Sequence, residues 1–272
     1  MLPREDGGVS PARRLLLTGL AAVVLLAAAV LVVLRVTGSD PASPAVAQDR
    51  PGPVLLVPGY GGSTAALSVL AARLRAQGRD ARVVALPGDG TGDLAEAARV
   101  LGRAASERVA AGAPSVDVVG YSAGGVVARL WVRDEGGAAL ARRVVTLGAP
   151  HHGTGVAQLA VALAPGACPQ ACRQLVPSSP LLTALNRGDE TPAGPQWLSL
   201  WSPADTVVTP PDSARLDGAV DVALDGVCAD ARPAHGDLPR DPLVTGIVLR
   251  ALGPAPVAAP VAADCASLRA GG

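Results

Sequence analysis

A five-residue motif, GYSAG at residues 120–124, constrains this chain more than any other feature of its sequence. It follows a strand pattern at residues 116–119, VDVV, and precedes a helical pattern at residues 126–133, which fits a sharp turn from a strand into a helix. The flanking glycines permit a turn too tight for Cβ atoms, so Ser122 is expected at its tip with an exposed hydroxyl. The following helix would direct backbone N–H groups toward negative charge that develops there. The alternative is an ordinary strand-to-helix turn with no chemistry.

Strand and helix patterns alternate through the body of the chain. Strands are expected at residues 53–57, 81–86, 116–119, 142–147, 196–201 and 220–224. Helices are expected around residues 67–78, 93–112, 126–133 and 241–253. Asp93 with Glu96 resembles a capping box, and Asp241 followed by Pro242 suits a helix start. This alternation predicts an α/β fold with a mostly parallel sheet and helices on both faces.

One N-terminal apolar run indicates on which side of the membrane the rest of the chain is expected. Residues 15–34 carry no charge, and 20 helical residues span roughly a 30 Å hydrocarbon core. Arg13 and Arg14 precede the run, which predicts that residues 1–14 are cytoplasmic and that the chain after Arg35 is extracytoplasmic. A cleaved secretory signal is the alternative, with the Ala-Val-Ala sequence at residues 45–47 as its cleavage site. An uncleaved membrane anchor is favoured because the run is long and this site lies well beyond it.

The remaining segments and the cysteines suggest one catalytic domain. Residues 35–52 have the composition of a linker, residues 53–253 form the expected catalytic domain, and residues 254–272 form a tail. An even number of cysteines agrees with an oxidising compartment, and pairing neighbour with neighbour is the simplest of three possibilities. The four cysteines are Cys168, Cys172, Cys228 and Cys265. Pairing neighbours would join Cys265, the one cysteine of the tail, to Cys228 and so attach the tail to the domain. No metal site is expected because the first pair has no nearby histidine.

A catalytic serine needs a base, and the chain has only three histidines. In α/β folds with a serine at such a strand-to-helix turn, the serine precedes the acid and the acid precedes the histidine along the chain, which selects His235. Asp205 is the expected acid because it follows the strand at residues 196–201, at the sheet edge where active-site loops gather. The rival acids are Asp212, which is next best, then Asp189, Asp217 and Asp221. The other two histidines, His151 and His152, are expected to be structural.

Two glycine-rich loops need separate interpretations. The loop at residues 58–63 follows the first strand of the body, and the backbone N–H of Tyr60 is expected to form an oxyanion hole with that of Ala123. The alternative is a flexible loop without a catalytic role. The GDGTGD loop at residues 88–93 lacks the lysine of a phosphate-binding loop, and the chain contains no lysine, so a plain loop is expected.

Several segments together resemble a known family. PGYGG, VDVVGYSAGG, VVTLGAPHHGT, CPQACRQL, LSLWSPADTVV and the late histidine occur in this order across residues 53–253. They resemble the bacterial secreted lipases and esterases of the α/β-hydrolase superfamily. The resemblance implies a triad of Ser122, Asp205 and His235, oxyanion amides at Tyr60 and Ala123, and no metal or organic cofactor. This chain departs from many relatives, which have His where it has Pro58 and often Met where it has Ala123.

These observations predict a carboxylic ester hydrolase that works through an acyl-enzyme and acts on a small-molecule or lipid ester. One alternative is a cell-envelope acyltransferase on the same scaffold, and another is a catalytically inactive envelope-binding homologue. The balance of 23 basic and 23 acidic residues gives no electrostatic reason to expect a nucleic-acid partner, and a monomer is expected. Residues 148–195 either line an acyl pocket or simply pack on the sheet.

Overall fold

The computed structural model describes residues 12, 17, 20, 23–26 and 46–272. The expected cytoplasmic segment and the expected anchor or signal segment, residues 1–14 and 15–34, therefore lie mostly outside the described residues. Within the described part of the chain, no helix combines the length and the apolar character needed to cross a bilayer.

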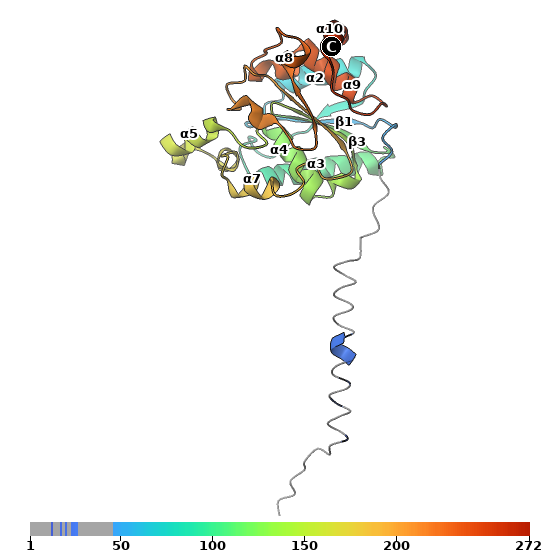
Figure 1. Cartoon of the computed structure of the whole chain (residues 1–272), viewed down its shortest axis with the longest axis vertical. Coiled ribbons are helices and arrows are strands. Elements are labelled where there is room, and N and C mark those ends of the chain that lie inside the picture. The colour runs from blue at the N-terminus through green and yellow to red at the C-terminus, as the bar shows by residue number, and fades with distance from the viewer. Residues whose placement is uncertain (1–11, 13–16, 18–19, 21–22, 27–45) are drawn as a thin grey trace, which may run out of the picture. The chain divides into compact units, whose positions relative to one another are not determined.

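A six-stranded parallel sheet occupies the centre of the unit formed by residues 46–272 (Figure 1). Its spatial order is β2-β1-β3-β4-β5-β6, and every neighbouring pair is parallel. The central strands β3 and β4 are buried on both faces and do not show the apolar–polar alternation of a half-exposed strand. The strands are β1 (Val54–Val57), β2 (Ala81–Val83), β3 (Val116–Tyr121), β4 (Ala141–Leu147), β5 (Gln196–Trp201) and β6 (Val220–Ala223).

Helices cover both faces of the sheet, as the alternation of patterns predicts. On one face lie α3 (Leu94–Ala110), α4 (Ala123–Asp134) and α7 (Pro180–Leu185). They share one hydrophobic core, which includes the buried side chain of Trp131. On the other face lie α2 (Ala65–Ala76), α8 (Leu224–Val227), α9 (Pro242–Ala251) and α10 (Cys265–Gly271). Two further helices, α5 (Gly155–Leu163) and α6 (Gln170–Gln174), lie between β4 and β5 in the sequence.

Several predicted boundaries differ from the observed ones. The second strand ends at Val83 rather than at residue 86, so Leu86 lies in a loop. Asp93 caps α3 by accepting a hydrogen bond from the amide of Ala95, but no capping box forms because Glu96 pairs with Arg99 instead. The predicted tail, residues 254–272, is more ordered than expected, because its last part forms α10, which packs against α9. The sequence signal for this helix is weak, since only seven residues belong to it.

The last residues of the expected linker contact the folded unit. Val46 is buried, and the side-chain amide of Gln48 donates to the backbone carbonyl of Gly194 at 3.3 Å. The carbonyl of Gln48 in turn accepts from Arg142 and Arg143. Composition identifies this segment only as rich in proline and alanine, so it does not predict polar contacts of this kind.

Buried charges gather at the amino ends of β3 and β4. Asp117 is completely buried, and its carboxylate accepts two bonds from Arg142 at 2.9 and 2.7 Å and one from Arg79 at 2.7 Å. Arg142 and Arg143 are also completely buried and donate to backbone carbonyls, including that of Gln48. This cluster, which we call the Asp117 cluster, ties the sheet to the chain segments before β1 and after α9.

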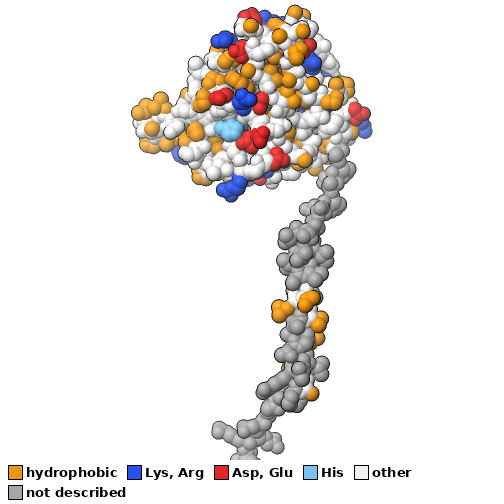
Figure 2. Space-filling view, viewed as in Figure 1, with side chains coloured by type: hydrophobic (Ala, Val, Ile, Leu, Met, Phe, Trp, Pro, Cys, Tyr) orange, Lys and Arg blue, Asp and Glu red, His pale blue; other side chains and the backbone are white. Residues whose placement is uncertain are grey.

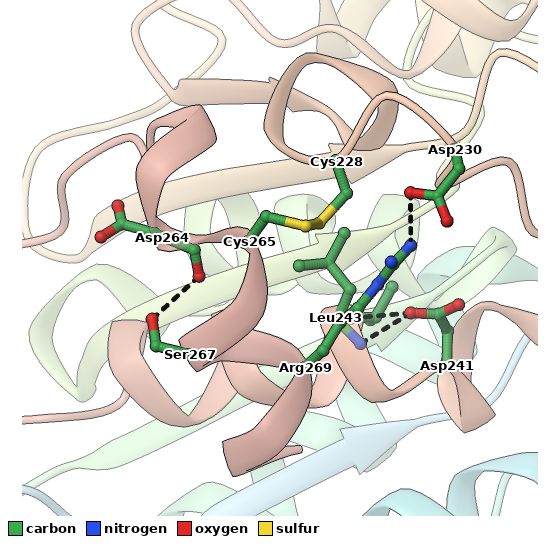
Figure 3. Close-up of a disulfide and its surroundings, with 9 residues drawn as sticks. Cys228, Asp230, Asp241, Leu243, Asp264, Cys265, Ser267 and Arg269 are labelled. Atoms are coloured by element: carbon green, nitrogen blue, oxygen red, sulfur yellow. Dashed lines mark hydrogen bonds and ion pairs between the residues drawn. A yellow bond between two sulfur atoms is a disulfide. The ribbon is translucent and has the colours of Figure 1, made fainter.

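Two disulfides join neighbouring cysteines, Cys168 to Cys172 and Cys228 to Cys265. Figure 3 shows the second one holding the start of α10, where Arg269 also pairs with Asp230 at 2.9 Å. The backbone of α10 approaches α9 so closely that a Cβ on Gly246 would lie 2.7 Å from the carbonyl carbon of Leu268. The disulfide therefore stabilises a tight helix contact at the C-terminus.

Candidate active site

Ser122 occupies a strained turn at the carboxyl end of β3. Its φ of 54° and ψ of −128° make it the one non-glycine residue with positive φ in the described part of the chain. The glycines of the motif permit this turn: a Cβ on Gly120 would lie 2.6 Å from the carbonyl oxygen of Gly124, and one on Gly124 would lie 2.7 Å from that of Pro58. Such strain costs on the order of 1–3 kcal/mol and persists only where the surroundings impose it.

His235 links the hydroxyl of Ser122 to a carboxylate. Its Nε2 lies 3.0 Å from the Oγ of Ser122, and its Nδ1 lies 2.6 Å from Oδ2 of Asp205. With the Nδ1 proton donated to the carboxylate, Nε2 is the nitrogen that can accept the serine proton. All three side chains are at most 9% exposed, so bulk water competes little for these bonds.

Backbone amides fix the other oxygen of Asp205. Its Oδ1 accepts hydrogen bonds from the amides of Val207 and Val208 at 2.8 and 2.9 Å. The carboxylate therefore has one oxygen for the backbone and one for His235, which orients the imidazole. Among the acids considered from the sequence, only Asp205 forms a hydrogen bond with this histidine; the rivals are Asp189, Asp212, Asp217 and Asp221.

The loop that carries one of the two expected oxyanion amides lies against the serine. A Cβ on Gly59 would lie 2.8 Å from the Cβ of Ser122, so the loop that continues to Tyr60 abuts the serine directly. Among the described residues, neither the amide of Tyr60 nor that of Ala123 has a backbone acceptor in the hydrogen-bond network of loops and turns. The amide of Ala123 also stands at the start of α4, where the helix dipole favours negative charge.

Tyr121 is a neighbour of the site that the sequence did not identify. Its hydroxyl donates to the backbone carbonyl of His235 at 3.2 Å, and its ring centroid lies 5.2 Å from that of the imidazole. Burial, together with the nearby charge of Asp205, raises the pKa of the phenol to about 12, so it stays a donor at any physiological pH. Its position inside the GYSAG motif was the only signal that could have found it.

Removing this hydroxyl is expected to lower activity selectively. Tyr121→Phe should reduce kcat about fivefold, because a hydrogen bond worth about 1 kcal/mol no longer holds the backbone of His235, which carries the imidazole. Ester hydrolysis and urea denaturation would be measured on the same preparations. Ser267→Ala is the matched control, since Ser267 also donates a hydroxyl to a backbone carbonyl, that of Asp264 (Figure 3). Equal effects of the two substitutions on kcat would contradict a positioning role for Tyr121.

The other two histidines lie outside this network. His152 pairs with Glu190 at 2.9 Å near the surface. His151 is completely buried, and its Nε2 lies 3.1 Å from the hydroxyl of Thr146 while its Nδ1 has no partner among the described residues. Burial, the nearby charge of Arg129 and that of His152 lower the pKa of His151 well below its usual value.

Because His151 is buried in its neutral form, the free energy of unfolding should depend on pH. As pH falls through about 6.5, His151 takes up a proton in the unfolded chain but not in the folded one, so the free energy of unfolding should fall. In His151→Gln this loss between pH 7 and pH 5 should be smaller, as measured by urea denaturation. His152→Gln serves as the control because His152 is partly exposed. An unchanged pH dependence in His151→Gln would contradict the assignment.

The described residues contain no cluster of His, Cys, Asp and Glu side chains that could hold a metal ion.

The leucines of the segment between β4 and β5 fall into a buried group and an exposed group. Leu175, Leu182 and Leu185 are buried in the core, whereas Leu159 and Leu163 on α5 are exposed. Figure 2 shows hydrophobic side chains at the tip of the lobe that α5 forms in Figure 1.

Comparisons with known proteins agree with this architecture. Residues 105–217, less than half of the chain, match the family described as Lipase (class 2). The structure resembles Aspergillus fumigatus lipase B, at 17% identity and a TM-score of 0.65, over 80% of this chain and 56% of that one. It also resembles the mature form of Bacillus licheniformis lipase BlEst2, at 20% identity and a TM-score of 0.63, over 79% of this chain and 94% of that one. No curated protein matches the sequence. The resemblance to lipases of the α/β-hydrolase fold is therefore confirmed.

Proposed function

From an α/β-hydrolase fold and a similarity to class 2 lipases, we propose that this chain is a carboxylic ester hydrolase of the lipase and esterase type. One observation carries the proposal: His235 lies within hydrogen-bond distance of both Ser122 and Asp205, at 3.0 and 2.6 Å. A serine, a histidine and an acid joined in this way form a nucleophile, its base and the group that orients the base.

In the proposed first step, the Oγ of Ser122 attacks the ester carbonyl while Nε2 of His235 takes its proton. The carbonyl oxygen becomes negatively charged and accepts hydrogen bonds from the amides of Tyr60 and Ala123, each typically worth about 10² to 10³ in turnover. The protonated His235, stabilised by Asp205, then donates its proton to the leaving alcohol. This leaves an acyl group on Ser122.

In the second step, water replaces the alcohol. His235 removes a proton from the water, the resulting nucleophile attacks the acyl carbon, and Ser122 regains its proton as the acid departs. The two half-reactions use the same base and the same oxyanion amides. An alcohol acceptor in place of water would give acyl transfer, so hydrolysis and transfer are distinguished by their products.

A fluorophosphonate probe tests the proposed nucleophile directly. The full chain should be labelled at Ser122, and His235→Ala should slow labelling at least about 10²-fold because the general base is lost. Product analysis with added alcohols would then separate a hydrolase from an acyltransferase. A folded chain that is not labelled at Ser122 would instead indicate an inactive binding homologue.

We further propose that the enzyme acts outside the cytoplasm on a lipid ester. The two disulfides support an oxidising compartment, and the similarity to class 2 lipases supports a lipid ester substrate. Attachment through residues 15–34 and a monomeric state belong to the same proposal. Fractionation of cells that express the full chain tests the attachment, since an uncleaved anchor predicts that the protein sediments with membranes.

A further inference from the structure

Thr154 joins the start of α5 to residues 205–209, which we call the acid loop because Asp205 begins it. Thr154 ends the VVTLGAPHHGT segment and has no part in the proposed mechanism. Its hydroxyl donates to the backbone carbonyl of Val207 at 2.6 Å and accepts from the amide of Thr209 at 3.0 Å. The amide of Gly155 donates to the carbonyl of Thr209 at 2.8 Å. These bonds hold the acid loop against the start of α5.

The proton of the Thr154 hydroxyl has one destination. Backbone amides can only donate, so the oxygen accepts from Thr209 and, at 3.3 Å, from Val156 in the first turn of α5. A backbone carbonyl can only accept, so the proton goes to Val207. The hydroxyl of Thr209 is farther away, at 3.4 Å. Thr154 is 6% exposed, so bulk water competes little for these bonds.

One peptide group carries this hydrogen bond on to the carboxylate of Asp205. The carbonyl of Val207 and the N–H of Val208 belong to the same planar peptide. The carbonyl accepts from Thr154, and the N–H donates to Oδ1 of Asp205 at 2.9 Å. Hydrogen bonds in such a chain polarise and strengthen one another. The chain therefore runs from Thr154 through this peptide and the carboxylate to the imidazole of His235.

The alternative is that Thr154 serves only as the N-cap of α5. A cap hydroxyl accepts from an amide of its own helix, here that of Val156 at 3.3 Å. The two bonds to the acid loop are shorter, at 2.6 and 3.0 Å, and capping does not use the hydroxyl proton. The shorter contacts of Thr154 are therefore with the acid loop.

A second residue of the same segment approaches the pair of Asp205 and His235. Gly148 has a φ of 53°, and its amide donates to the carbonyl of Leu200 at 2.8 Å. A Cβ on Gly148 would lie 3.1 Å from Oδ2 of Asp205 and 3.3 Å from Nδ1 of His235, so its backbone leaves no room for a side chain there. The segment after β4 thus approaches Oδ2 directly and reaches Oδ1 through the peptide that Thr154 holds.

We infer that Thr154 is a positioning residue, which holds the peptide between Val207 and Val208 so that Asp205 stays directed at His235. This inference rests on the proposed function. Thr154 acts only through the carboxylate and is not in contact with the reacting atoms. Loss of its hydroxyl should therefore slow the chemical step and leave ester binding nearly unchanged.

Thr154→Val tests the inference, because valine has nearly the same shape but no hydroxyl. For p-nitrophenyl acetate, kcat should fall about 10- to 10²-fold, while KM changes less than about threefold. Fluorophosphonate labelling of Ser122 should slow by a similar factor, because it needs the same base. Thr154→Ala, which also lacks the hydroxyl, should match Thr154→Val. Thr154→Ser keeps the hydroxyl and should stay within about threefold of the wild type.

Ser179→Ala is the matched control. Ser179 is also 6% exposed, caps α7 and donates its hydroxyl to a backbone carbonyl, that of Gln174 at 2.7 Å. Its loss should lower stability in urea as the loss of any cap does, but should change kcat less than about twofold. An undiminished kcat in both hydroxyl-free variants of Thr154, or an equal loss in Thr154→Ser, overturns the inference while leaving ester hydrolysis intact. A wild type that neither hydrolyses the ester nor reacts with fluorophosphonate would instead refute the proposed function.

Discussion

Alanine in place of Ser122 is expected to lower kcat for a simple ester, such as p-nitrophenyl acetate, by about 10⁶-fold without unfolding the protein. The proposed mechanism forms its covalent bond at this one oxygen, and neither His235 nor Asp205 can substitute for it. A residual rate above that in water should remain, because the oxyanion amides still bind the developing charge. Initial rates and circular dichroism on the same samples would measure the effect.

Glycine at the same position gives a matched comparison. Ser122→Gly should be as inactive as Ser122→Ala, but more stable by about 1 kcal/mol, because only glycine adopts the positive φ of this residue without strain. Urea denaturation of both variants would show the difference. Activity that survives in either variant would refute the nucleophile. Equal stability would mean that the turn is not strained.

The largest loss of stability is expected from Asp117→Ala. Removing this carboxylate leaves the guanidinium of Arg142 completely buried without its anionic partner, and such a loss typically costs about 3–5 kcal/mol of unfolding free energy. Arg79 loses its partner at the same time. Urea denaturation would measure the change, and kcat per folded molecule should stay the same because the cluster lies at the other end of the sheet.

Asp230→Ala is the control for this prediction. Asp230 also pairs with an arginine, Arg269, at 2.9 Å, but its side chain is 74% exposed (Figure 3). Exposed pairs contribute about 0–1 kcal/mol, so the variant should be nearly as stable as the wild type. If Asp117→Ala and Asp230→Ala lower the free energy of unfolding equally, then burial of the Asp117 cluster does not determine its contribution to stability.

The sheet could be predicted because its strands are short, mostly apolar segments between turn residues. The pattern predicts a mostly parallel sheet but not the spatial order of its strands, and four of the five segments that carry the resemblance lie at the ends of β1, β3, β4 and β5. The positions proposed for the triad were selected by chain order and strand ends. Neither argument depends on side-chain packing, so both could be made from a single sequence.

Features that depend on side-chain packing could not be predicted. Asp117, Arg142 and Arg143 are charged residues in strands, and a strand pattern alone suggests that such residues face solvent, whereas all three are buried. The role of Tyr121 depends on a contact between residues 114 positions apart. The loop before α3 is joined to α6 by hydrogen bonds of Asp93 with Gln174 and of Thr91 with Ala171, and nothing in the loop's composition indicates that contact.

The contacts of Gln48 with Arg142 and Arg143 determine where the polypeptide enters the catalytic body. Entry is at the amino ends of the strands, whereas Ser122 follows the carboxyl end of β3, a strand length of about 20 Å away. A resin, a fused tag or a lipid surface attached ahead of residue 46 would thus join the folded unit at the end of the sheet opposite the proposed active site. The immobilised protein should consequently keep the proposed active site accessible to ester substrates.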